Sequence, residues 1–424
     1  MKRLLIIGYV WPEPASSAAG SRMLQLIRLF LADGWDVTFA SAAAPSVHAV
    51  DIESLGVHKV QVALNHHSFD QFVGQLRPDM VMFDRFMIEE QFGWRVAQQC
   101  PKALRLLDTE DLHCLRAARQ QAHKSGTPVG VAELNSELAM REVASILRCD
   151  LSLIISAYEV GLLQTHYGVD PSLLWHLPFM LAPVAEADFP GFGARSGYIS
   201  IGNFRHAPNW DAVLALKHTV WPAIRGLQAD ARLSVYGAYP SPKAMQLHDP
   251  GEGFLVHGWA DDARAVMTCA RVCLAPLRFG AGLKGKLVEA MACGTPSVTT
   301  SIGAEAMHDG LPWSGEVVDD LKVFAERAVA LYHDPQAWQR AQCRGVDILR
   351  THYDAAQLGS SLLVRISELR ASLVVHRQHN FIGAMLQHHS LQSTRYMAQW
   401  IEAKNRNRDS VATSSDGAAE DLSA

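Results

Sequence analysis

The sequence has no excess of positive charge. Its 38 lysines and arginines are outnumbered by 43 aspartates and glutamates, and the formal net charge is −5. A protein that binds nucleic acid usually shows a basic excess. We therefore expect no nucleic-acid partner.

Cysteine is scarce and irregularly placed. The chain has seven cysteines, an odd number, and none belongs to a Cys-x-x-Cys or Cys-x-x-His pair. Disulfide frameworks and zinc sites depend on regular spacing of these residues. The pattern indicates reduced, mostly buried thiols in a cytoplasmic protein.

Long hydrophobic runs are absent too, and no stretch is long enough to span a membrane. Lys2-Arg3 followed by four apolar residues looks like the start of a signal peptide. The apolar run is too short, however, and Trp11-Pro12 stands where a small-residue cleavage site would be. A buried first β-strand explains the run better.

Two ligand-binding motifs are also missing. No Gly-x-Gly-x-x-Gly follows the first predicted strand, which argues against a dehydrogenase. No Asp-x-Asp stands at the end of a predicted strand. We therefore expect chemistry that needs neither a metal nor a cofactor.

The sequence does contain a regular alternation of short apolar runs with longer amphipathic stretches. Such alternation is typical of βαβ units that build a mainly parallel sheet. A segment rich in proline and glycine near the middle divides the 424 residues into two α/β halves. We predict two Rossmann-like domains over 1–182 and 198–353, a linker over 183–197, helices over 354–404 and a disordered tail over 405–424.

The positions of the strands and of the clearest helices follow from the same pattern. Helices are expected at 21–32, 321–333 and 335–352. The predicted strands are 4–9, 36–41, 79–83, 104–108 and 151–155 in the first half, and 198–202, 233–237, 254–257, 272–275, 297–300 and 316–318 in the second.

The most informative segment is RFGAGLKGKLVEAMACGTP, residues 278–296. A strand should end before it, and a helix should run from about Lys284 to Cys293, with Gly294 as its C-terminal glycine. Glycines before a helix let a ligand approach the backbone, and the free N–H groups of the first turn attract phosphate. The segment therefore predicts a phosphate site at the start of this helix.

Charged side chains extend this predicted site. Lys284 and Lys286 place positive charge beside Gly282 and Leu283, at the positive end of the helix. Glu289 lies one turn further, within reach of a ribose beside a bound pyrophosphate. Together these residues point to a nucleoside diphosphate, although a solvated lysine loop is the simpler alternative, above all for Lys286.

A second segment, LDTEDLHCLR at 107–116, follows a predicted strand. Ligands of open α/β sheets gather at the carboxyl ends of the strands. Asp111 and His113 are therefore candidates for binding or positioning an acceptor. The alternative is a charged loop whose aspartate caps the next helix.

Residues 282–296, followed by TSIGAE at 300–305, resemble the retaining glycosyltransferases of family 4, which have the GT-B fold. Further likeness lies at 201–209, at 256–259, and in the first half at 156–159 and 167–171. The resemblance spans about residues 1–370. It implies that two Rossmann-like domains face each other across a cleft.

The family likeness implies a role for individual residues. Glu289 would hold the donor ribose, Lys284 or Lys286 the diphosphate, and Arg205 the same phosphates unless it is a surface arginine. His257 and Gly258 would lie against the base. Gly20 would approach the donor phosphate, and Arg22 would face the cleft or else be an exposed helix arginine.

The resemblance also implies the reaction. A sugar would pass from a nucleoside diphosphate to a glycan or lipid-linked acceptor with retention, and contact with a membrane surface is compatible with such acceptors. The first of two glutamates common in the family is replaced by Ala281, so contacts to the donor sugar must differ. A 2-epimerase or hydrolase of the same fold, or an inactive binding protein, remain alternatives, and the oligomeric state stays open.

Overall fold

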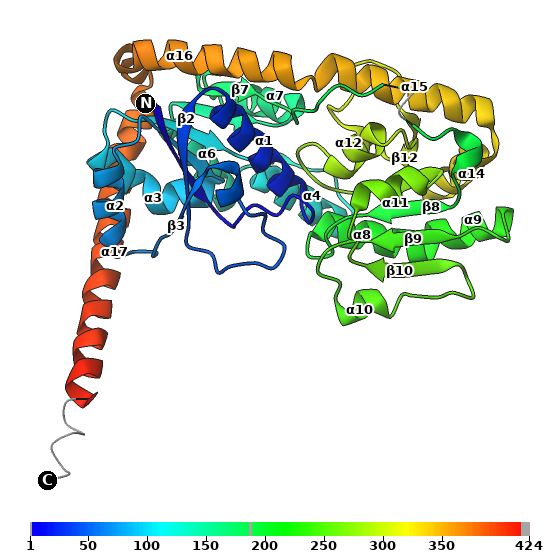
Figure 1. Ribbon diagram of the computed structural model, residues 1–424, viewed down its shortest axis with the longest axis horizontal. Helices are drawn as coiled ribbons and strands as arrows, with labels where there is room; N and C mark the ends of the chain where they lie inside the picture. Colours follow the sequence, from blue (N-terminus) through cyan, green and yellow to red (C-terminus); the bar gives the residue numbers. More distant parts are fainter. Residues whose placement is uncertain (1, 186–188, 417–424) are drawn as a thin grey trace, which may run out of the picture.

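The computed structural model describes residues 2–185 and 189–416. Its named strands form two sheets, of seven and six strands, and all strand pairs within the sheets are parallel. Figure 1 shows the sheets in two lobes side by side, with two helices, over 335–352 and 355–379, running end to end along them. The α/β fold with two Rossmann-like domains is therefore confirmed.

The first sheet has the order β3-β2-β1-β4-β5-β6-β7. Strands β2 and β3 are added on one side of β1, and strands β4 to β7 are added on its other side. All five predicted strands are present. Two more lie at the sheet edges. In β3 most residues are exposed and give no apolar pattern, and β7 has only three residues. The strands are β1 (Lys2–Gly8), β2 (Trp35–Ser41), β3 (His58–Gln61), β4 (Met80–Asp84), β5 (Leu104–Asp108), β6 (Leu151–Ile154) and β7 (Leu174–His176).

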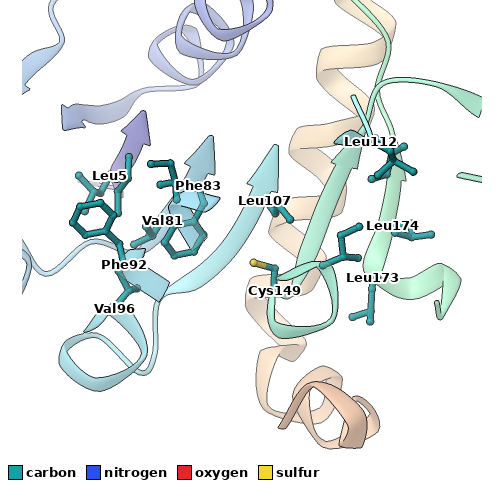
Figure 2. Packing of buried hydrophobic residues seen from close by; sticks show 14 of the residues in the cluster. Leu5, Val81, Phe83, Phe92, Val96, Leu107, Leu112, Cys149, Leu173 and Leu174 are labelled. Carbon is teal, nitrogen blue, oxygen red and sulfur yellow. The ribbon is translucent and has the colours of Figure 1, made fainter. Parts of the chain in front are cut away.

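Helices cover both faces of this sheet, and Ser17 caps the first of them by accepting a hydrogen bond from the Gly20 N–H. Figure 2 shows Phe92 and Val96 of α3 lying against Val81 and Phe83 of the sheet. The helices are α1 (Ala18–Ala32), α2 (Ser68–Leu76), α3 (Phe86–Gln99), α4 (His113–Ser125), α5 (Val131–Leu134), α6 (Glu137–Arg148) and α7 (Ala157–Thr165), with 3₁₀ turns η1 (Glu53–Leu55) and η2 (Pro171–Leu173).

The second sheet has the order β10-β9-β8-β11-β12-β13. All six predicted strands are present. They are β8 (Tyr198–Ile201), β9 (Leu233–Tyr236), β10 (Phe254–Gly258), β11 (Val272–Ala275), β12 (Ser297–Thr299) and β13 (Gly315–Val317).

The helices of this second domain include the three that the sequence predicts, at about 284–293, 321–333 and 335–352. They are α8 (Ala207–Ala215), α9 (Trp221–Leu227), α10 (Pro242–Met245), α11 (Ala263–Cys269), α12 (Gly285–Ala292), α13 (Ser301–Ala304), α14 (Leu321–His333) and α15 (Pro335–His352), with the 3₁₀ turn η4 (Phe192–Ala194) and the π-helical turn η5 (Leu216–Val220).

The chain then returns to the first domain through α16 (Ala355–His379), the long helix along the top of Figure 1. Leu362, Ile366 and Leu369 of α16 join the core beneath β1 and β5. Helix α17 (Phe381–Asp416) packs on α3 and α6. Where the sequence predicted a disordered tail, the structure continues α17 through 405–416, although the Asn, Asp, Ser and Thr residues of this segment favour a helix only weakly. Residues 417–424 lie outside the described residues.

All seven cysteines lie in the described part of the chain, and none forms a disulfide; four of them are buried. Across residues 2–185 and 189–416, no helix combines the length and apolar character that crossing a bilayer requires.

Candidate active site

The loop between β11 and α12 lies at the junction of the two domains. Gly282 has a φ of 60°, a conformation that favours glycine. A Cβ added to Gly282 would lie 2.7 Å from the Cβ of Asp111 in the other domain. No side chain caps α12, so the N–H groups of its first turn are available to an anion.

Lys284 is the residue just before α12, and its side chain is buried, with 8% of the residue exposed. Its Nζ donates a hydrogen bond of 2.7 Å to the Gly282 carbonyl. Burial lowers the pKa of Lys284 to about 8, although Glu305 and Glu159 oppose the shift. An ammonium group has three donors, so two remain for a ligand.

Lys286 and Arg205 approach the same junction from different sides. Lys286 is half-buried, and its Nζ lies 2.8 Å from the position of a Cβ on Gly202. Burial lowers the pKa of Lys286 to about 8. Arg205 is exposed, with its guanidinium carbon 3.9 Å from the centre of the Tyr239 ring.

Glu289 lies one turn into α12 and is half-buried. Burial raises the pKa of its carboxyl, and the nearby Arg264 partly offsets this shift. Within the described residues no side chain or backbone N–H hydrogen-bonds the Glu289 carboxylate. The group is thus available to a ligand hydroxyl.

Asp111 and His113 lie on the first-domain side of the junction. Arg116 pairs with Asp111 and, with His113 nearby, holds the pKa of this carboxyl well below its usual range despite its burial. The Nε2 of His113 lies 3.7 Å from Asp111 Oδ1. Burial lowers the pKa of His113 to about 4, so the imidazole is neutral near pH 7.

Arg22 corrects one of its two expected positions, because it is not an exposed helix arginine. The residue is 1% exposed, and its Nε donates to Asp108 Oδ1 at 2.9 Å while Nη1 donates to the Leu177 carbonyl at 2.6 Å. The apolar pattern of α1 did not predict that Arg22 is buried. The residue that compensates its charge, Asp108, belongs to β5 and is not part of the pattern of α1. Gly20 packs against Glu13, whose backbone a Cβ on Gly20 would meet at 2.4 Å.

His257 and Gly258 end the edge strand β10. The exposed His257 ring stacks on Tyr236, with 4.6 Å between ring centres and 13° between planes. Gly258 has a φ of 75°. The stacked pair offers a flat surface of the kind that holds a base.

Sequence reasoning missed the contacts that join the domains. Arg119 of α4 forms two hydrogen bonds with Glu305, of 2.8 and 2.7 Å, and donates to the Gly280 carbonyl at 2.9 Å. The fully buried Glu159 of α7 accepts from the Gly282 N–H at 2.8 Å. Neither residue departs from an ordinary helical pattern, so no sequence signal distinguished them.

No cluster of three or more histidine, cysteine, aspartate or glutamate side chains in the described residues could hold a metal ion. The charge that surrounds the α12 terminus is instead carried by Lys284, Lys286 and Arg119.

Comparison with known families decides the class of this site. Residues 195–334, which include every second-domain residue discussed above, match the model of the family described as glycosyl transferases group 1. The second domain is thus that of a group 1 glycosyltransferase. This family corresponds to the family 4 transferases, which retain the configuration of the sugar and use nucleotide sugars as donors.

Three solved structures share the fold of most of the chain, between 86% and 88% of it. Sucrose-phosphate synthase from Thermosynechococcus elongatus is 16% identical, with a TM-score of 0.64 over 88% of this chain and 100% of that one. HepE from Anabaena, in complex with UDP and glucose, is 12% identical, with a TM-score of 0.65 over 87% and 100%. TarM from S. aureus, in complex with UDP and other ligands, is 7% identical, with a TM-score of 0.67 over 86% and 99%.

The transferase therefore has the GT-B fold, as the resemblance implied. A comparison with curated proteins gave no significant match.

Proposed function

We propose that this transferase binds a nucleoside diphosphate sugar at the start of α12 and transfers the sugar to a hydroxyl of a glycan or lipid-linked glycan, without a metal ion. The observation that carries the proposal is the joint placement of Lys284, Lys286 and the uncapped end of α12 beside the other domain.

The chemistry needs positive charge at the leaving group. When the bond from the anomeric carbon to the diphosphate breaks, negative charge grows on the diphosphate oxygens, and preorganised donors stabilise it most. The two free donors of Lys284 and the N–H groups of α12 supply this charge. The acceptor oxygen forms the new bond on the same face of the sugar, and its proton passes to an oxygen of the leaving diphosphate.

Other residues would fix the donor around this point. Glu289, whose carboxylate has no partner in the described residues, would accept hydrogen bonds from the ribose hydroxyls. Arg205 would meet the phosphates from the opposite side. The base would lie near the stacked rings of Tyr236 and His257.

UDP is the first nucleotide to test. HepE from Anabaena has been solved with UDP-glucose, and TarM from S. aureus with UDP. The experiment is a calorimetric titration of UDP, GDP, ADP and TDP into the transferase, followed by turnover with the sugar form of whichever nucleotide binds.

The Lys284→Ala variant then tests the site itself. Removing one donor from a preorganised charge site costs about 10²- to 10³-fold in turnover, so we expect a loss of that size in release of the nucleoside diphosphate. Lys322→Ala, which removes an exposed lysine on α14 of the same domain, is the matched control and should behave as wild type. Wild-type turnover in Lys284→Ala would refute the assignment.

Product analysis separates transfer from the alternatives. A glycosylated acceptor in the mass spectrum supports the proposal. Free sugar or a 2-epimer as the sole product would show a hydrolase or an epimerase, and binding without any product would show a protein that only recognises the nucleotide sugar.

A further inference from the structure

Three strands of the first sheet end side by side, at the edge where open α/β sheets bind ligands. Tyr9 follows β1, Arg85 follows β4, and Glu110 lies two residues beyond β5. Asp84 and Asp108, the last residues of β4 and β5, are direct neighbours in the sheet. Five polar side chains thus meet at one point of the sheet edge.

The backbone at this point is strained in two places. Arg85 has φ of 73° and ψ of 158°, a combination found almost only in glycine. Glu110 has φ of 64°, in the left-handed region that residues with a side chain avoid. Such conformations persist where the surroundings enforce them, and they concentrate at functional sites.

The surroundings do enforce the first of them. The Arg85 N–H donates to the Asp108 carbonyl at 2.8 Å, and the Tyr9 N–H donates to Asp84 Oδ2 at 3.0 Å. These two hydrogen bonds, one to a backbone carbonyl and one to a carboxylate, hold the ends of the three strands together.

The side chains at this edge leave polar atoms without hydrogen bonds. Arg22 Nη2 and Asp84 Oδ1 are buried and form no hydrogen bond within the described residues, although Asp84 Oδ1 lies 3.5 Å from Arg85 Nε as an ion pair. Glu110 is 9% exposed, and no described residue hydrogen-bonds its carboxyl. Buried polar groups are normally satisfied, so this set calls for polar groups from a ligand or from water.

Charge makes Glu110 unusual among these groups. It lies near Asp84, Asp108, Arg85 and Arg22, and burial together with the two aspartates raises the pKa of Glu110 well above its usual range, against the pull of the two arginines. Whatever its proton count, the carboxyl accepts hydrogen bonds from hydroxyl groups. The ring of a sugar carries several such hydroxyls.

The mouth of this site suits a sugar ring. Tyr9 is 45% exposed, and the Arg85 guanidinium carbon lies 5.0 Å from the centre of its ring, which holds the ring in place. An exposed aromatic face with a polar edge is a surface on which an amphipathic ring can pack. The donor loop is close, because Asp111, the next residue after Glu110, is the one that touches Gly282.

We propose that Tyr9, Arg85 and Glu110 form the acceptor subsite, in which Glu110 hydrogen-bonds a hydroxyl of a neutral sugar whose ring packs on Tyr9. This inference rests on the proposed function, since it supplies the acceptor for the same transfer. It differs from the sequence expectation, which gave this role to Asp111 and His113, because Asp111 is already paired with Arg116.

The test measures binding of methyl glycosides of glucose, galactose, mannose and N-acetylglucosamine by saturation-transfer NMR, with and without UDP. We expect at least one glycoside to bind wild type, to bind Glu110→Ala at least 10-fold more weakly, and to bind Glu110→Gln within about threefold, because the amide oxygen also accepts a hydrogen bond from a hydroxyl. Glu137→Gln, which changes an exposed carboxylate of the same domain, should bind as wild type.

Glu110→Gly guards against loss of folding as the explanation. Glycine adopts a φ of 64° without strain, so this variant should unfold at the same temperature as wild type or higher, and still lose the glycoside. The inference is overturned if no glycoside binds wild type, or if Glu110→Ala or Glu110→Gly binds it as wild type does. Failure of UDP to bind would instead count against the proposed function.

Discussion

Single residues around the α12 terminus owe their chemistry to burial. Lys284 and Lys286 are placed where positive charge is costly, so that both have a pKa of about 8. The cost is offset when an anion arrives, since the phosphate oxygens replace the water that the ammonium groups have lost. Binding of the diphosphate should therefore depend on pH in a range where an exposed lysine would be fully charged.

The affinity for UDP and the free energy of unfolding should change with pH in opposite directions. Below pH 8 Lys284 is charged both folded and unfolded; between 8 and its unfolded pKa of 10.5 only the unfolded chain keeps the proton. The unfolded state then binds more protons, so the stability of wild type relative to Lys284→Met should rise with pH, by about 1 kcal/mol per unit. UDP affinity of wild type should fall over the same range.

Titration calorimetry with UDP and urea unfolding, each from pH 7 to 10, measure the two trends. Lys322→Met, at an exposed site, is the control and should follow wild type in both. An affinity for UDP that stays constant to pH 10 would show that neither buried lysine meets the diphosphate.

The carboxyl of Glu159 connects helix α7 to the loop before α12. Glu159 Oε1 accepts from the Gly282 N–H at 2.8 Å and from the Leu112 N–H at 2.9 Å. Burial raises the pKa of Glu159 to about 8, with the Asp111 carboxylate adding to the shift. Near pH 7 the side chain is therefore mostly a neutral acid whose carbonyl oxygen holds two backbone groups.

The neutral form predicts a clear contrast between two variants. Glu159→Gln keeps an oxygen in the same place and should change the free energy of unfolding by less than about 1 kcal/mol. Glu159→Ala strands two buried N–H groups, each at a cost of about 1–3 kcal/mol. Guanidinium unfolding at pH 7 measures both, and equal losses in the two variants would mean that the carboxyl is charged in the folded protein.

How far the elements could be predicted depends on local signals. Helices α14 and α15 were predicted from their apolar pattern, and their first residues agree with the structure, in which Asp320 and Asp334 cap them and Pro335 occupies the first helical position of α15. The edge strand β3 was missed because its exposed residues form no apolar pattern, and the end of α17 because a polar composition does not exclude a helix.

The residues of the candidate site also fall into two groups, those that a local sequence pattern predicts and those that it does not. The donor residues from Gly282 to Glu289 form one continuous segment, so the sequence alone could group them. Glu110, Arg119 and Glu159 join the site only through pairing of strands and contact between domains, over sequence separations that no local pattern encodes. Arg22 was placed wrongly because its partner, Asp108, is 86 residues away.

The whole molecule is held in one arrangement by a few contacts between its domains. Besides the Arg119–Glu305 pair, Tyr239 donates to Glu13 at 2.9 Å, and His48 stacks on Trp259 with 4.1 Å between ring centres. Glu305 also faces Lys284. The position of the domains is thus coupled to the charge that surrounds the proposed diphosphate.

Charge reversal tests this coupling. Arg119→Glu places two carboxylates together at a site where the partners are 9% and 17% exposed, so the domains should separate, the radius of gyration in X-ray scattering should increase, and turnover should fall. UDP affinity should change less, because most of its proposed contacts lie in one domain. Glu305→Arg should have the same effects, and the double reversal should recover part of the loss, with a coupling free energy of roughly 0.5–3 kcal/mol between the two sites.

Arg141→Glu, which breaks the exposed pair with Glu90 within the first domain, is the control and should leave the radius of gyration unchanged. If the double reversal is no better than the single variants, the pair does not hold the domains together, and the backbone contact of Arg119 with Gly280 must carry that role.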